Sequence, residues 1–82
     1  SAKAERVFLK LLDMFADQGR RVNATSGPTY APKQFAEHPE AEGCTKRALK
    51  SAMEVLFNNG TLTVCQEGPP SKRISYVARA AK

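Results

Sequence analysis

Basic and hydroxyl side chains gather in two short stretches of the second half of the chain. The first stretch holds Thr45, Lys46, Arg47, Lys50 and Ser51, and the second holds Ser71, Lys72 and Arg73. Arginine and lysine donate hydrogen bonds to phosphate oxygens and to guanine edges, and serine or threonine can serve either target. These residue types predict binding to nucleic acid. Lys33 is a weaker candidate for a phosphate contact, since a cation in the first turn of a helix is slightly unfavourable.

The net charge of +5 is unevenly distributed along the 82 residues. Residues 1–44 carry six Lys/Arg and six Asp/Glu, whereas residues 45–82 carry seven Lys/Arg against Glu54 and Glu67. A one-sided basic field favours a polyanion, and a solubilising surface is the plainer alternative. An anionic membrane is less favoured, because no exposed aromatic or leucine-rich helix face accompanies the charge. Arg20 and Arg21 follow the predicted first helix, whose dipole attracts cations at its C-terminus, and phosphate contacts by this pair are the alternative.

The sequence offers little for catalysis or metal binding. It has no G-x-x-x-x-G-K-[ST] loop, His38 is its one histidine, and Cys44 and Cys65 stand apart without a Cys-x-x-Cys pair. A zinc site needs four ligands, and a catalytic histidine needs a nucleophile placed beside it. We therefore predict a protein that is not an enzyme and takes no metal, cofactor or small-molecule substrate. No apolar segment marks secretion or a membrane span, so reduced thiols in a cytoplasmic protein are expected.

Three helices are expected to position the basic residues. Apolar residues from Ala4 to Phe15 recur at helical spacing, and Gly19 is a natural stop after Gln18. A short extended piece and a loop follow over residues 20–29. Pro32 suits the first position of a second helix, with Tyr30 and Phe35 as its hydrophobic staple, and Pro39 should end that helix by about residue 38.

The third helix carries the first basic stretch. Thr45 or Cys44 should open it, with Thr45 the better N-cap, and Asn58, Asn59 and Gly60 tolerate the conformations that end a helix. Its apolar face consists of Leu49, Ala52, Met53 and Leu56, and its opposite face consists of Lys46, Arg47, Lys50, Ser51 and Glu54. The basic residues thus lie on the side away from the core.

Two strands should carry the second basic stretch. Alternation predicts a strand beginning near Thr61 with Leu62 and Val64 on its buried side, and a return strand over residues 74–77. Gly68, Pro69 and Pro70 cannot continue a strand and should form the turn between them. The proline pair would stiffen this turn, so that Lys72 and Arg73 project from it with little loss of entropy.

The element order predicts an α+β domain of the winged helix-turn-helix type, with three helices and a two- or three-stranded antiparallel wing sheet. Residues 1–82 suffice for one such domain, because a chain of this length fills one small core. We expect it to bind double-stranded DNA, with the third helix in the major groove and the wing on adjacent backbone. A winged helix used for protein–protein contact or oligomerisation is the main alternative, and a free-standing transcriptional regulator is a second, since fold does not choose between them.

Several motifs add a family resemblance. They are TYAPKQFAEHPEAEG at residues 29–43, TKRAL at 45–49, Ala52-Met, Leu56-Phe and Gly68-Pro-Pro-Ser. Together they resemble the C-terminal tail of RepA-like ATPases of the AAA family from bacterial phages, prophages and plasmids. The likeness covers most of the chain, from the first helix through Ser71. It implies a winged-helix appendage of a replicative helicase, located in the bacterial cytoplasm at the nucleoid, that contacts DNA, the helicase core or a replication partner. The Walker motif of such a core is absent here, so no ATPase activity is assigned to these residues.

Overall fold

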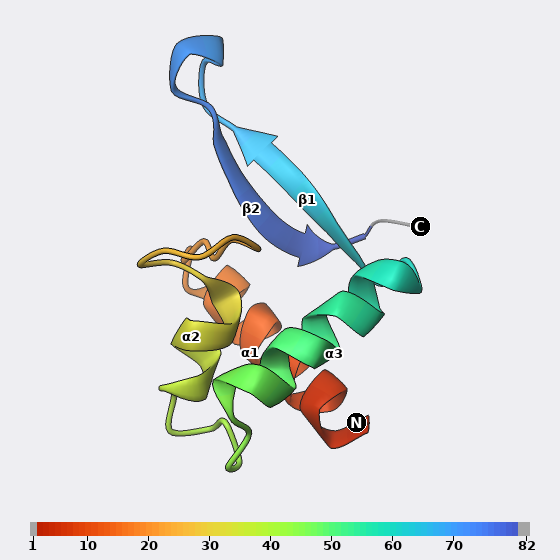
Figure 1. The fold of residues 1–82 in the computed structure, drawn as a ribbon. Helices are drawn as coiled ribbons and strands as arrows, with labels where there is room; N and C mark the ends of the chain where they lie inside the picture. The colour runs from red at the N-terminus through yellow and green to blue at the C-terminus, as the bar shows by residue number, and fades with distance from the viewer. Residues whose placement is uncertain (1, 81–82) are drawn as a thin grey trace.

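The computed structural model describes residues 2–80, which form three helices and one antiparallel hairpin (Figure 1). The elements are α1 (Ala2–Asp17), α2 (Ala31–Ala36), α3 (Lys46–Asn58), β1 (Leu62–Glu67), the short 3₁₀ helix η1 (Pro70–Lys72) and β2 (Ile74–Arg79). The helices pack into one body, and the hairpin stands out from it with η1 at its far end. The predicted α+β class and element order are confirmed.

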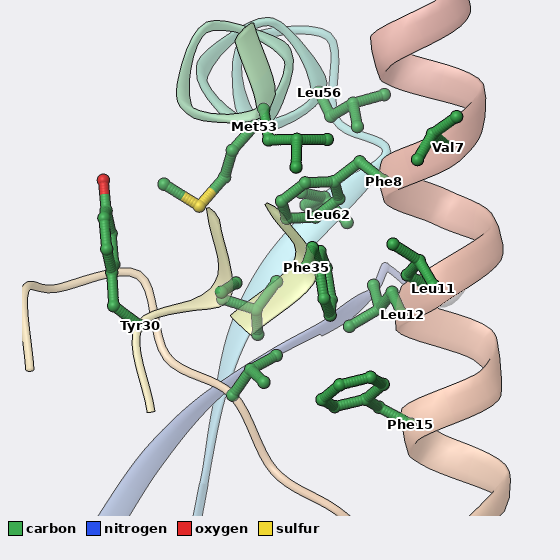
Figure 2. Packing of buried hydrophobic residues seen from close by; sticks show 14 residues of the cluster. Val7, Phe8, Leu11, Leu12, Phe15, Tyr30, Phe35, Met53, Leu56 and Leu62 are labelled. Atoms are coloured by element: carbon green, nitrogen blue, oxygen red, sulfur yellow. The ribbon is translucent and has the colours of Figure 1, made fainter. Parts of the chain in front are cut away.

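Helix α1 supplies much of the core. Its predicted apolar face is buried along its whole length, and the rings of Phe8 and Phe15 meet Phe35 of α2 edge-on, with centroid distances of 4.9 and 5.1 Å (Figure 2). Such edge-to-face pairs are worth about 0.5–1.5 kcal/mol beyond the area that they bury. The core cluster comprises Val7, Phe8, Leu11, Leu12, Phe15, Val22, Tyr30, Ala31, Phe35, Leu49, Met53, Leu56, Leu62 and Val77. Gly19 ends α1 in the left-handed region at φ 71°, as predicted.

Helix α2 begins one residue earlier than predicted. The carbonyl of Tyr30 accepts the first helical hydrogen bond, from the Gln34 N–H at 3.0 Å, so Tyr30 is the N-cap and Pro32 is the second helical residue. The predicted staple numbering is therefore wrong by one position, although Tyr30 and Phe35 still share the core. The helix ends at Ala36, two residues before the predicted end.

Helix α3 begins and ends where the sequence predicts. The Thr45 Oγ1 accepts a hydrogen bond from the Ala48 N–H at 3.1 Å, and this bond satisfies one of the amides that the first helical turn leaves open. Asn58 is the last helical residue, and Gly60 turns the chain at φ 83°. The predicted apolar face, Leu49, Ala52, Met53 and Leu56, is buried.

The hairpin is only partly anchored in the core. Val64 pairs with Val77 in the antiparallel register, yet Val77 is 3% exposed and Val64 is 50% exposed. The prediction that Val64 is buried was wrong, because the hairpin leaves the helical body after Leu62 and only β2 remains beside it. On the other side of β2, the Val77 N–H donates to the Val22 carbonyl at 2.7 Å. Within residues 2–80 this contact does not extend into a third strand, and the sheet consists of β1 and β2.

Candidate nucleic-acid interface

The exposed face of α3 presents the first group of predicted binding residues. Lys46, Arg47, Lys50 and Ser51 are all exposed, because burial of Leu49 and its partners turns this side of the helix to solvent. Thr45 is also exposed, but its hydroxyl caps the helix. Lys46 sits with its Nζ 5.6 Å from the centre of the Tyr30 ring. Tyr30 itself is 6% exposed, so its ring is not free to stack on a base.

The second group lies at the far end of the hairpin. Gly68 adopts φ 98° and starts the turn, and the Lys72 N–H donates to the Pro69 carbonyl at 2.9 Å to close η1. Ser71 and Lys72 are exposed at this tip, as predicted. Arg73 is exposed too, but its Nη1 reaches back toward the Gln66 Oε1 at 3.4 Å. Lys72 is therefore the cation of the tip itself.

Two polar residues beside the tip were missed by the sequence analysis. Gln66 pairs with Ser75 across the hairpin, and the Gln66 Nε2 lies 3.5 Å from the Ser75 Oγ. Both side chains lie on the same sheet face as Leu62 and Val77, which are nearer the helical body, since alternate residues of a strand share a face. The sequence signal for this pair was the change from apolar to polar residues along the face, from Leu62 and Val64 to Gln66 and from Val77 to Ser75. With Arg73, they form a polar surface next to the basic tip.

The two basic groups lie at opposite ends of the molecule and do not form one cluster. Figure 1 shows the tip projecting away from the helices, while the N-terminus of α3 lies on the other side of the body. The longest dimension of the domain is 38 Å. The domain is thus about as long as one turn of duplex DNA, which rises about 34–36 Å. Lys33 is exposed on the short helix α2, which packs against α3 and lies away from the hairpin tip (Figure 1).

Ion pairing divides most of the cations into two classes, and Lys3 and Arg20, which belong to neither, also have no salt bridge within residues 2–80. Arg6, Lys10, Arg21 and Arg79 each pair with a carboxylate at 2.6–2.8 Å. In contrast, no salt bridge within residues 2–80 involves any of the six predicted binding cations, which are Lys33, Lys46, Arg47, Lys50, Lys72 and Arg73. Cations without a carboxylate partner keep their charge and their hydrogen-bond donors available to an anion.

Arg21 anchors the hairpin to the helical body. Its Nε donates to the Glu67 Oε1 at 2.6 Å, and its guanidinium carbon lies 4.5 Å from the centre of the Tyr76 ring. The hydrogen bond to Glu67 raises the pKa of Arg21. Arg20 makes a specific contact too, since it stacks on Phe15 with 3.9 Å between its guanidinium carbon and the ring centre.

Arg79 makes a second tie between the hairpin and α1. Its Nε and Nη2 donate to the two carboxylate oxygens of Asp13, each at 2.8 Å. Such a bidentate pair fixes the relative orientation of the two side chains. The hydrogen bond to Asp13 raises the pKa of Arg79. The sequence separation of 66 residues left no local pattern from which this pairing could be predicted.

Glu42 pairs with two cations of α1, Arg6 and Lys10, on another part of the surface. Its carboxylate accepts hydrogen bonds from Arg6, at 2.8 and 3.2 Å, and from Lys10 at 2.6 Å. These hydrogen bonds, the one from Arg6 foremost, lower the pKa of Glu42 to about 2. Lys10 also lies 4.0 Å from the Glu40 Oε1, so two carboxylates balance Arg6 and Lys10 and this part of the surface has little net positive charge.

Comparisons with known proteins identify no relative. No family model, curated protein or solved structure matches the chain. Within residues 2–80, no helix is long and apolar enough to cross a membrane, and no group of three or more His, Cys, Asp or Glu side chains is placed to hold a metal ion. Cys44 and Cys65 are both free thiols and half-buried.

Proposed function

We propose that the domain is a winged helix-turn-helix that binds double-stranded DNA through α3 and the hairpin tip. The observation that carries this proposal is the division of the cations. Lys46, Arg47, Lys50 and Lys72 are exposed and without a salt bridge in the described chain, whereas the cations that join structural elements are paired. A surface that served solubility alone would not require this separation.

In the proposed complex, the exposed face of α3 enters the major groove. Lys46, Arg47, Lys50 and Ser51 lie within the first half of the helix, which recognition helices present to base edges. Arginine has the geometry to bind guanine with two hydrogen bonds, so Arg47 is the residue best suited to base readout. The lysines contact phosphates. Thr45 acts on this surface by capping α3 and so fixing the start of the helix.

The hairpin is proposed to contact the sugar–phosphate backbone at a second place. Lys72 and Ser71 would contact the backbone at the tip, and Arg73, Gln66 and Ser75 would contact it next to the tip. The Arg21–Glu67 pair and the Val77–Val22 hydrogen bond hold this arm in a defined direction from α3. Because the arm is already held in place before binding, less conformational entropy is lost when the complex forms.

The resemblance to RepA-like ATPases suggests where such a domain works. We propose that it is a DNA-binding accessory part of a plasmid or phage replication protein in the bacterial cytoplasm, without catalytic activity of its own. A single small domain with few phosphate contacts binds weakly, and attachment to a multisubunit ATPase would raise its avidity. This setting is compatible with the modest size of the basic surface.

A pair of charge-matched variants tests the proposal. Lys50→Gln and Lys3→Gln make the same change at exposed helical positions, but Lys50 lies on the proposed interface and Lys3 lies at the start of α1. We expect Lys50→Gln to weaken duplex binding and to reduce the slope of log K against log salt by about 0.9, the value for one phosphate contact. Lys3→Gln should leave the slope unchanged. Equal effects of the two variants would reject this interface and favour a winged helix used for protein contact.

A further inference from the structure

A hollow lies between α1 and β2, outside the residues proposed to contact DNA, although two of its residues, Arg21 and Val77, also hold the hairpin in place. Its floor and walls are mainly apolar, and arginines stand at its rim. It is lined by Leu12, Asp13 and Ala16 of α1, by Arg20 and Arg21 of the following segment, and by Tyr76, Val77, Ala78 and Arg79 of β2. None of the predicted DNA-binding residues is among them.

The size of the hollow limits what can occupy it. Its volume is about 140 Å³. Pockets for cofactors and other drug-sized ligands have volumes of roughly 300–1,000 Å³, so the hollow is too small for a nucleotide. A cavity of about 150 Å³ accommodates benzene. One bulky apolar side chain, such as phenylalanine, therefore matches the available space.

The rim of the hollow favours negative charge next to that side chain. Arg20 has no carboxylate partner within residues 2–80, since its guanidinium contacts the Phe15 ring and the Gln18 Oε1. Arg21 donates to Glu67 through its Nε alone, and Arg79 donates to Asp13 through its Nε and Nη2 but not through its Nη1. Since Glu67 and Asp13 already balance the charges of Arg21 and Arg79, Arg20 is the lining cation whose charge remains available to a carboxylate beside the mainly apolar floor.

We propose that this hollow is a docking site for an acidic peptide segment of a partner protein. One bulky apolar side chain of the segment fills the space beside Leu12, Ala16 and Val77. A carboxylate that flanks it binds Arg20, which has no carboxylate partner within residues 2–80, whereas Arg21 and Arg79 stay paired with Glu67 and Asp13. The domain would then hold DNA on α3 and the hairpin tip and a partner protein on α1 and β2.

A short fluorescent peptide tests this docking site. The probe has one phenylalanine flanked by aspartates and glutamates, and a control peptide has alanine in place of phenylalanine. Binding is followed by fluorescence anisotropy, and the site is located by amide shifts in NMR spectra. We expect the alanine peptide to bind at least about tenfold more weakly, because apolar groups in a pocket carry discrimination of this order. The amide chemical-shift changes caused by peptide binding should centre on Ala16 and Ala78.

Two variants of α1 separate docking from folding. Ala16→Leu fills the hollow, whereas Ala2→Leu makes the same exposed substitution at the other end of the helix. Only Ala16→Leu should abolish peptide binding, and both variants should retain duplex binding. Arg20→Gln should weaken the acidic peptide but not a peptide with asparagine and glutamine in place of the acids. Equal binding of the two probe peptides, peptide binding by Ala16→Leu, or loss of duplex binding in Ala16→Leu would each overturn the proposal.

Discussion

Replacement of Thr45 by alanine tests how α3 is positioned. Thr45 closes the N-terminus of α3 through the 3.1 Å hydrogen bond from the Ala48 N–H to its hydroxyl. The alanine variant removes the acceptor and leaves that amide, on a half-buried residue, to be satisfied by water. The helix should therefore fray at the end that carries Lys46 and Arg47, which is the end proposed to enter the groove.

The expected loss of stability follows from the geometry of this cap. Replacing a threonine N-cap with alanine costs about 0.5–2 kcal/mol, with typical values near 1 kcal/mol. For a domain of 60–100 residues, a change of 1 kcal/mol lowers the melting temperature by about 4–8 °C. A domain of this length has a total stability of about 4–12 kcal/mol, so Thr45→Ala stays folded at room temperature and its DNA affinity can be measured.

Thermal denaturation followed by far-ultraviolet circular dichroism provides the assay, with Thr45→Ser as the control. Serine keeps an oxygen at the same position and should retain the melting temperature of the parent. Thr45→Ala should also bind duplex DNA more weakly, and Thr45→Ser should restore binding. An unchanged melting temperature in Thr45→Ala, or an equal loss in Thr45→Ser, would refute the assignment of Thr45 as the cap.

Three further predictions concern acid stability, the core and the hairpin tip. The pKa of Glu42 is about 2 in the folded protein against 4.5 ordinarily. Its ion pairs therefore stabilise the fold fully above about pH 5, and this stabilisation is lost as the pH falls toward 2. Glu42→Gln should flatten this part of a plot of melting temperature against pH. Phe35→Ala should cost about 3–5 kcal/mol in urea unfolding, a large share of the total stability, since Phe35 is fully buried between two rings. Gly68→Ala should cost more than Gly60→Ala, because both have positive φ but only at Gly68 does a Cβ meet a backbone oxygen, that of Lys72, at 2.9 Å. Equal losses at the two glycines would contradict the tight turn.

The helical part of the fold was predictable because its signals are local. The spacing of apolar residues located α1 and α3, Thr45 located the start of α3, and Gly19 and Gly60 marked turns. The prediction of burial failed in the hairpin, where exposure depends on tertiary packing and not on the local pattern. Val64 alternates with its neighbours like a buried residue, but it is exposed because the hairpin extends beyond the helical body. No pattern within a single strand records where that body ends.

The candidate site was predictable as a set of side chains but not as an arrangement. Exposure of Lys46, Arg47 and Lys50 followed from the helical period. The pairing of Arg21 with Glu67 and of Arg79 with Asp13 joins residues 46 and 66 positions apart, so charge counts along the chain could not separate paired from unpaired cations. That separation, which required the structure, is the main support for the proposed interface.

A salt titration of duplex DNA binding by the isolated domain tests the central claim most directly. Four to six phosphate contacts by the unpaired cations should give log K a slope of about −4 to −5 against log salt. We expect measurable affinity at low salt that falls steeply as salt is added. Absence of duplex binding below millimolar concentrations at low salt, or an affinity independent of salt, would contradict the proposed DNA-binding function.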